Sequence, residues 1–392
     1  MLNLGRPNHS GASNRKYVIG CGVLVAIVLI YILAEMWWLT ASSIPVARER
    51  LVIPEADAAL LVRLDPDQAG LKALIQSVWK VFEEKAASDQ DKQQLEVCKR
   101  IGRGDGAQGA VALMGFPIEA AFVAVSDLAT KKLLVYQAIS LSKYANTRMR
   151  SFKYAASDRR KNKPDFCRSY KGYSLLIEEK AGASMTMVAN TMAAADSVEL
   201  LQKAVDRITS DEMGFSTKSR LRKLYDRLSP DSQALFLADN SHGYIDTVLA
   251  TGLDTALPEL PREDRSALAG LRTAITAVSG EMNLPAANRL ELRATIEAVS
   301  PEAAARIEEV LSAFVDGLVK RGLAVKLAAS TEGSMLRTEV ALDGVDKLVI
   351  ERFTKDLAEQ KAKAEAAARS KEQTSPPPST APGASGESPK KE

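Results

Sequence analysis

Aromatic residues, histidine and cysteine are scarce in this chain of 392 residues. Phenylalanine, tryptophan and tyrosine make up 5% of the sequence, which argues against a surface of stacking platforms for bases or sugars. Two histidines and three cysteines provide neither zinc-finger spacing nor a dense disulfide scaffold. Lys and Arg number 52 against 49 Asp and Glu, a balance that disfavours a dedicated nucleic-acid-binding protein. We therefore expect no metal, no cofactor and no nucleic-acid partner.

Catalytic motifs are missing as well. The sequence has no GxSxG elbow, Walker loop, HExxH or EF-hand loop. The run Gly104–Gly109 matches GxGxxG, but it precedes an expected strand instead of following one, so it indicates a glycine-rich loop. Any Ser–His–acid or Cys–His site outside the membrane would need His242, which lies in a turn after Asp239. The sequence therefore favours a protein that is not an enzyme.

Hydrophobic residues make up 46% of the chain and include one long run near its start. Tyr17–Ala34 is an uncharged stretch of 18 residues, and Trp37 and Trp38 follow it. About 20 such residues span the roughly 30 Å hydrocarbon core of a bilayer, and aromatic rings favour its interfaces. We predict a transmembrane helix over residues 17–39 in contact with the lipid bilayer. A cleaved signal peptide is the alternative.

The charges around this run predict its orientation. Residues 1–16 carry Arg6, Arg15, Lys16 and no acid, which places this arm in the cytoplasm. Residues 40–50 then form a juxtamembrane link to the rest of the chain. We expect a single-pass protein of the bacterial inner (cell) membrane, with its main domain periplasmic or extracellular.

The other end of the chain is polar. Lys371–Glu392 contains five prolines in 22 residues and no large apolar side chain. Such a segment buries too little surface to offset the entropy of ordering, so we expect a disordered tail over 371–392. Residues 361–370 are rich in Ala, Lys and Glu and predict the solvated end of a long helix. The folded body should span about 51–360.

The C-terminal part of the body has clear patterns. Arg289–Val299 alternates apolar and polar residues, as in a strand with one buried face and one solvated face. Ser300 and Pro301 predict an N-cap and first turn, and Gly322 the end of that helix. The remaining elements expected here are strands at 275–284, 325–329 and 336–342 and a helix from about 345.

The N-terminal part follows the same plan. The patterns predict strands at 59–64, 110–114, 121–125, 133–142, 174–178 and 184–189, and helices at 71–82 and 197–208. A short apolar strand, a turn beginning with Asp65 and a helix containing Leu71 resemble the later sequence around Asp239 and Ile245. We therefore interpret the body as two related α+β halves, 51–210 and 225–360. Each would contain antiparallel sheet with packed amphipathic helices.

Two cysteines, Cys98 and Cys167, follow the membrane segment. In an oxidising compartment two thiols of one domain often form a disulfide, and we predict this bond. A pair of separate buried thiols is the alternative.

One segment is strongly basic. Between Arg148 and Lys171, nine cations face only Asp158 and Asp165. Outside the membrane such a patch would meet anionic lipid headgroups, an acidic cell-wall polymer or an acidic protein. Pairing with acids elsewhere in the fold is the alternative. The nine cations are Arg148, Arg150, Lys153, Arg159, Arg160, Lys161, Lys163, Arg168 and Lys171.

The openings of the two halves carry a family resemblance. Residues 54–61 (PEADAALL) contain a proline, an acid and a short apolar strand, and residues 229–236 (SPDSQALF) repeat this order. The layout resembles exported bacterial proteins of unknown function that have one N-terminal anchor and a duplicated α+β body. The resemblance implies no activity. We expect a membrane-anchored envelope protein that presents a non-enzymatic binding or scaffold domain. The alternatives are a carrier of lipid or another hydrophobic ligand, with a cavity between sheet and helices, and an envelope hydrolase.

Overall fold

The computed structural model describes residues 43–86, 89–101, 111–112, 114–127, 132–143, 145–178, 183–249 and 261–374. The predicted arm and span at 1–39, the Gly104–Gly109 loop and residues 375–392 of the predicted tail lie outside these ranges. Among the described helices, none combines the length and the apolar character needed to cross a membrane.

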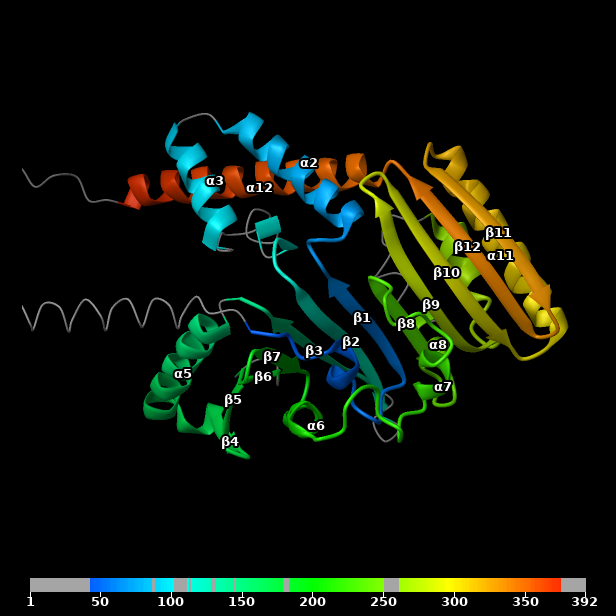
Figure 1. The fold of residues 1–392 in the computed structure, drawn as a ribbon, viewed down its shortest axis with the longest axis horizontal. Coiled ribbons are helices and arrows are strands. Elements are labelled where there is room, and N and C mark those ends of the chain that lie inside the picture. The colour runs from blue at the N-terminus through cyan, green and yellow to red at the C-terminus, as the bar shows by residue number, and fades with distance from the viewer. Residues whose placement is uncertain are drawn as a thin grey trace, which may run out of the picture.

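The body is an α+β fold built on one antiparallel sheet of 12 strands, as the sequence predicted in outline (Figure 1). The strands of both predicted halves belong to this single sheet. In order across the sheet they are β11 (Ala324–Glu332), β12 (Met335–Asp343), β10 (Arg289–Ala298), β9 (Ile275–Ala286), β8 (Ala234–Asp239), β1 (Ala58–Leu64), β2 (Ile118–Asp127), β3 (Lys132–Leu141), β7 (Thr191–Ala195), β6 (Ser184–Val188), β5 (Tyr173–Ile177) and β4 (Cys167–Tyr170).

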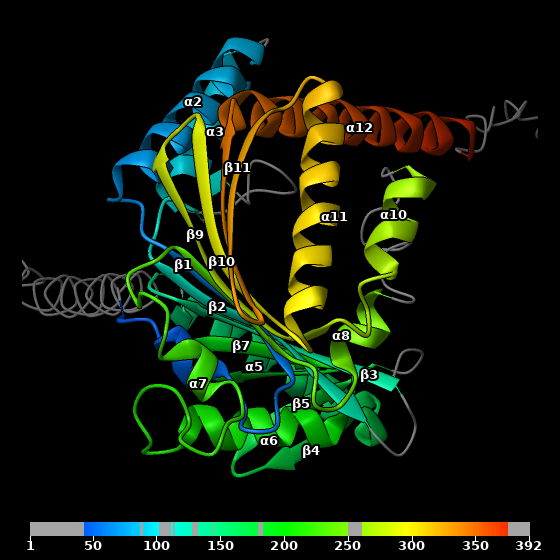
Figure 2. The same cartoon turned by 90° about the vertical axis from the view of Figure 1, so that its right-hand side faces the viewer.

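Helices pack on both faces of the sheet. Figure 2 shows α6 on one side of the strands and α10 and α11 on the other. The described α-helices and 3-10 helices are η1 (Arg48–Leu51), α2 (Ala69–Lys85), α3 (Asp89–Ile101), α5 (Ala145–Asn162), η2 (Pro164–Phe166), α6 (Val198–Thr209), α7 (Arg222–Tyr225), α8 (Tyr244–Thr247), α10 (Arg262–Ala269), α11 (Pro301–Lys320) and α12 (Val345–Thr374).

The centre of the sheet is the pairing of β1 with β8. Leu60 lies opposite Phe236, and the pairs extend from Ala58 with Ala238 to Val62 with Ala234. On either side of this seam the strand order repeats, as β1-β2-β3-β7-β6 in one direction and β8-β9-β10-β12-β11 in the other.

The largest core lies on the side of α6. Alternate residues of the central strands, such as Leu61 and Leu235, point to this side and are fully buried. Side chains of α6 and of η1 cover them, including Leu201, Val205 and Leu51. Ser197 caps α6 through its hydroxyl, which accepts a hydrogen bond from the Leu200 amide at 3.1 Å. This face of β1, β2 and β8 is therefore closed.

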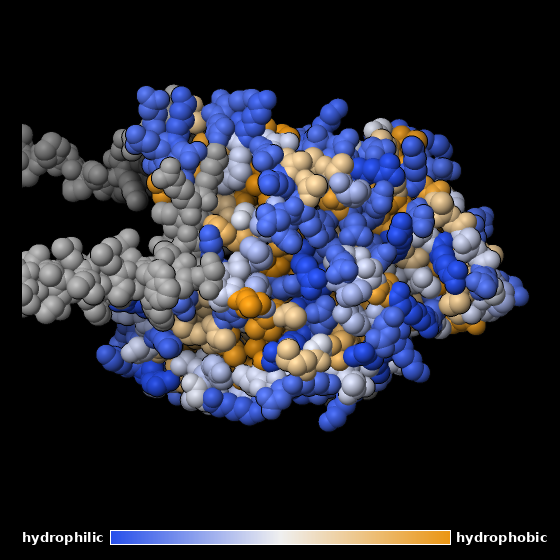
Figure 3. Space-filling model, in the orientation of Figure 1, coloured by the Kyte–Doolittle hydropathy of each residue, from blue (hydrophilic) through white to orange (hydrophobic). Residues whose placement is uncertain are grey.

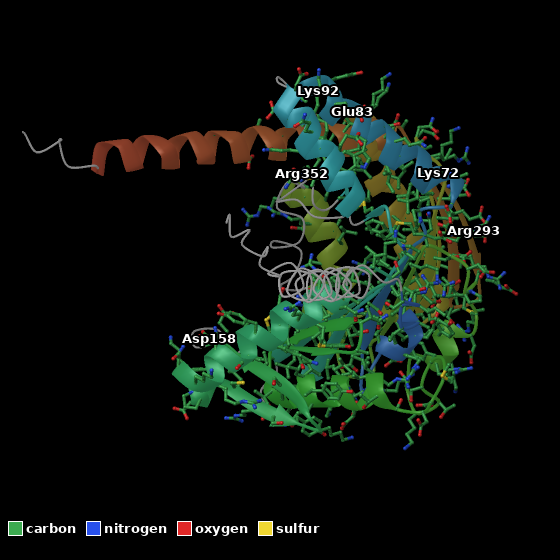
Figure 4. All side chains as sticks on the ribbon, turned by 60° about the vertical axis from the view of Figure 1, so that its left-hand side comes forward. Lys72, Glu83, Lys92, Asp158, Arg293 and Arg352 are labelled. Atoms are coloured by element: carbon green, nitrogen blue, oxygen red, sulfur yellow. The ribbon has the colours of Figure 1, made fainter. Side chains whose placement is uncertain are left out.

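A second core lies under α11 on the opposite face. Ile307 of α11 packs with Ile296 of β10 and Leu336 of β12. The predicted alternation of β10 is confirmed, because Arg293 and its same-face neighbours lie on the uncovered side and Arg293 points away from the sheet (Figure 4). Figure 3 shows that this uncovered face, on the right of the view, is largely hydrophilic. The cap at Ser300 and the end of the helix near Gly322, which has φ +89°, are also confirmed.

A third hydrophobic cluster joins helices from the beginning and the end of the body's sequence. Trp79 and Phe82 of α2 pack with Phe353 of α12 and with residues of α3. The later turns of α12 continue as a helix to Thr374, so residues 361–370 are helical as predicted, but Lys371–Thr374, which were predicted to begin the disordered tail, are helical as well. The first turn of α2 lies directly on β9, with Gly70 against the backbone of Leu284.

Most errors of the sequence interpretation lie in the N-terminal half. The strand predicted at 110–114 is wrong, because Val111, Ala112 and Met114 are helical. Val111 and Ala112 are buried against α2 and α3, and a short apolar run cannot by periodicity alone be assigned to strand or helix. Helix α5 and strands β4 and β7 were not predicted, nor was α10 in the C-terminal half. Helix α5 is polar on most of its circumference, with only Ala145 and Ala156 buried.

Two glycine-to-alanine substitutions should change stability in opposite directions. A Cβ at Gly70 would overlap the Leu284 carbonyl oxygen, so Gly70→Ala should lower the free energy of unfolding by about 1–3 kcal/mol. A Cβ at Gly317 in α11 would meet no atom closer than 3.9 Å, so Gly317→Ala should raise it by about 0.5–1 kcal/mol. Urea unfolding measures the free energy of unfolding of both variants. Equal effects would contradict the close approach of α2 to β9.

Candidate functional site

The central strands are apolar on both faces, unlike β10. Strand β1 begins Ala58-Ala59-Leu60-Leu61-Val62, and β2 contains Ala120–Val125, a run without polar residues. A strand of this kind is expected to be covered on both sides. Because α6 and η1 cover one face, the other face is the informative one.

That other face forms an apolar trough across five strands. Leu60 pairs with Phe122 on one side and with Phe236 on the other, so the three side chains share a face. Val135 of β3 and Val278 of β9 extend the same face outward. Leu60, Phe122 and Val135 are 40%, 39% and 41% exposed, although all three are large and apolar. We call this surface the apolar trough.

The trough contains a cavity of about 340 Å³. This volume lies within the range of small-molecule sites, about 300–1,000 Å³. Among the described residues that line it, Tyr244 of α8 is the one with a hydroxyl group. The cavity is lined by Ala58, Ala59, Leu60, Phe122, Val123, Ala124, Leu133, Val135, Phe236, Leu237, Ala238, Tyr244 and Val278.

The position of Phe236 depends on a glycine in the next strand. Phe236 pairs with Gly280 of β9, and a Cβ at this glycine would overlap the phenylalanine ring and the Arg293 carbonyl oxygen. The absence of a side chain therefore lets the ring lie over β9. Sequence inspection gives no reason to single out Gly280, because the contact depends on the strand register.

A charged cluster lies at the end of β1 nearest the cavity. The Asp57 side chain is fully buried, and its Oδ2 accepts a hydrogen bond from the Ser126 amide at 2.6 Å. Its Oδ1 lies 3.1 Å from Nη1 of Arg220 and 3.3 Å from Nδ1 of His242. The backbone of Asp57 also bonds to Ala124 and Asp239. The cluster thus joins β2, β1 and the segments flanking β8.

This cluster does not form a Ser–His–acid triad. Both ring nitrogens of His242 lie within 2.8 Å of the Arg220 guanidinium. The neighbouring Ser241 hydroxyl donates to Asp239, and no hydrogen bond joins it to His242. Among the described residues, no three acids, histidines or cysteines are grouped to bind a metal ion. The sequence expectation that His242 lies in a turn is confirmed, and its main partners are Arg220 and Asp57.

Tyr244 connects the cluster to the cavity. Burial raises the pKa of the Tyr244 hydroxyl, and the nearby negative charge of Asp57 raises it further. The hydroxyl is therefore neutral and available as a hydrogen-bond donor at the rim of an otherwise apolar cavity.

The basic segment is divided between α5, η2 and β4. Part of it is tied into the fold, since Arg159 donates to the Ile177 carbonyl at 2.8 Å and Lys171 pairs with Asp206 at 2.7 Å. Arg160 reaches the Ser174 hydroxyl at 3.2 Å. Within the described residues no acidic side chain pairs with the exposed cations Arg148, Lys153, Lys161 and Arg168.

The predicted disulfide is not present. Cys98 lies on α3 beside the cluster of Trp79 and Phe82, and the Cys167 thiol on β4 lies 3.6 Å from the Ala156 carbonyl. Helix α3 and strand β4 are at opposite ends of the body (Figures 1 and 2). The two thiols are therefore separate, as in the alternative left open by the sequence, but both are partly buried and not fully buried.

Comparison with known proteins gives no assignment: no family model matches the chain, and no curated protein or solved structure is significantly similar to it.

Removal of the buried carboxylate tests the charged cluster. Asp57→Ala should lower the free energy of unfolding by about 2–3 kcal/mol, because it leaves the Ser126 amide without its acceptor and the Arg220 guanidinium without its buried counter-ion. Glu332→Ala, which removes an exposed pair with Arg337, is the control and should have no measurable effect. Urea unfolding measures the free energy of unfolding of both variants. If both lose a similar small amount, Asp57 does not stabilise the pairing of β1 with β8.

Proposed function

We propose that the protein is a single-pass, membrane-anchored envelope protein whose body binds an apolar ligand in the trough. Residues 17–39 would supply the anchor and leave the body on the outer side of the membrane. Of the alternatives drawn from the sequence, this one combines the anchored binding domain with the hydrophobic-ligand carrier. The single observation that carries it is the cavity of about 340 Å³ on the open face of the central strands.

The two faces of the central strands differ in the exposure of their apolar side chains, and this difference supports the proposed function. Leu61 and Leu235 are fully buried under α6, whereas Leu60 on the opposite face is 40% exposed. A contiguous exposed apolar surface on a soluble domain commonly marks a binding site. The uncovered face of β10 is polar instead, because it carries Arg293 and other polar side chains. Solvent exposure alone therefore does not account for the apolar residues of the trough.

The lining indicates the class of ligand. Ala, Leu, Val and Phe side chains dominate, and Tyr244 offers one neutral hydroxyl. An aliphatic chain fits such a surface, because it needs apolar contact and no polar partner along its length. We assign the ligand class as an acyl chain or a similar aliphatic molecule.

The proposal includes an origin of the body by internal duplication. The repeated strand order around the β1–β8 seam supports it. So does a repeated turn, since the Asp67 amide donates to Asp65 Oδ1 and the Ser241 amide to Asp239 Oδ1, each at 3.0 Å. The two turns follow β1 and β8, the first strands of the two proposed copies.

A diazirine-bearing fatty acid tests the trough in the full chain reconstituted in vesicles. We expect crosslinks in β1, β2 and β3, detected by peptide mass spectrometry. Val135→Asp places a charge in the trough and should lower these crosslinks at least fivefold, about 1 kcal/mol of binding. Val299→Asp, at another exposed valine, is the matched control and should leave them unchanged. Crosslinks confined to residues 17–39, or equal yields from both variants, would contradict the proposal.

The anchor has its own test. Val25→Arg together with Leu29→Arg places two charges in the middle of the span, each costing about 2.5–3.5 kcal/mol of insertion. The double variant should lose carbonate-resistant association with membranes. Thr40→Arg with Ala41→Arg, beyond the span, is the control and should retain it. Retention of the first variant in the membrane pellet would exclude residues 17–39 as the anchor.

A further inference from the structure

The juxtamembrane link is fixed to the body at one end of β3. The Ser43 amide donates to the Ser142 carbonyl at 2.6 Å, and the Val46 amide donates to the Ser140 hydroxyl at 2.7 Å. The Asn190 side chain donates to the Ile44 carbonyl at 2.8 Å. These bonds hold the link in place, although Ile44 itself is 92% exposed and points an apolar side chain away from the body.

The length of the link limits the distance between this end of β3 and the bilayer. The predicted span ends at residue 39, four residues before Ser43. At about 3.3–3.6 Å per residue, four residues reach at most about 14 Å. The end of β3 must therefore lie close to the membrane surface if residues 17–39 cross it, and the exposed Ile44 is on this side of the body.

Helix α5 begins three residues after Ser142 and carries the cations of the basic segment. It contains six basic side chains and one acidic side chain, Asp158, which points outward in Figure 4. Ala145 and Ala156 face the body. Arg150, Tyr154 and Lys161 are spaced four and seven residues apart and share the opposite, exposed side. Tyr154 is 79% exposed in the middle of this side.

This composition matches an anionic membrane surface. Near such a surface each Lys or Arg contributes about 1 kcal/mol of attraction, and tyrosine favours the level of the headgroups. No acid among the described residues pairs with Lys153 or Lys161, so their charges are available to lipid. Because the link is short, these side chains lie beside the bilayer. A cationic patch elsewhere on the body would not lie there.

We infer that α5 lies on the surface of the bilayer that holds residues 17–39 and contacts anionic phospholipid headgroups through Arg150, Lys153, Tyr154 and Lys161. This inference rests on the proposed anchor and does not depend on the ligand of the trough. The helix provides a second contact with the membrane and fixes the orientation of the body. The cavity residue Leu133 lies at the other end of β3, eight residues or about 26 Å from Leu141, so the cavity is held away from the headgroups.

Lysine acetylation of the full chain in vesicles tests this contact. In vesicles containing phosphatidylglycerol, Lys153 and Lys161 should react at least fivefold more slowly than in phosphatidylcholine vesicles, as measured by mass spectrometry. Lys320, exposed on α11, is the internal control and should react equally in both. With Arg150→Glu and Lys161→Glu, the protection of Lys153 should disappear while the Lys320 rate stays constant.

The possible outcomes separate this inference from the anchor. Carbonate-resistant retention of the protein with the vesicles reports the anchor alone. If the protein is retained but Lys153 reacts equally fast with both lipids, α5 does not contact the bilayer and the inference fails. Protection by added poly-glutamate on phosphatidylcholine vesicles, without protection by phosphatidylglycerol, would assign α5 to an acidic polymer and also overturn it.

Discussion

The antiparallel pairing of β1 with β8 is the constraint on which the rest of the structure depends. It joins two sets of strands into one sheet, with Leu60 opposite Phe236 at its centre. It also brings Asp57, at the start of β1, beside Arg220 and His242, which flank β8 in the chain. The buried carboxylate would be costly without these partners and the Ser126 amide. The seam therefore determines both the floor of the apolar trough and the charged cluster at its end.

The two faces of these strands differ. Toward α6 they form a closed core that supplies hydrophobic stabilisation. On the opposite face, Leu60, Phe122 and Val135 remain partly exposed, and Gly280 leaves space for the Phe236 ring. A protein selected only for stability would cover these side chains or replace them with polar ones. Their retention in one contiguous surface is consistent with a binding role for the trough.

The two ends of β3 carry different groups. At one end, the fixed link and the cations of α5 are adjacent. At the other end are the cavity, Tyr244 and the Asp57 cluster. An anchor and a surface helix at the first end would leave the second end open to ligands or partners outside the membrane. The long α12, whose first turns pack on α2, extends beyond the sheet and is not part of either end.

Local signals in the sequence determined many elements of this protein. The alternation of β10, the Ser300 cap, the Gly322 stop and the hairpin at Gly333 act within a few residues, so the sequence alone predicts them. The apolar residues on both faces of β1 and β2 can also be read directly from the sequence. The sequence could not show which face would remain open, and it missed α5, whose circumference is mostly polar.

Only the tertiary structure decided the pairing of β1 with β8, the meeting of Asp57 with Arg220 and His242, and the separation of Cys98 from Cys167. It also decided that Val111 and Ala112 pack as helix against α2 and α3. Each of these depends on contacts between segments far apart in the chain. Residue periodicity carries no information about such contacts, because it reflects only the local geometry of a helix or strand.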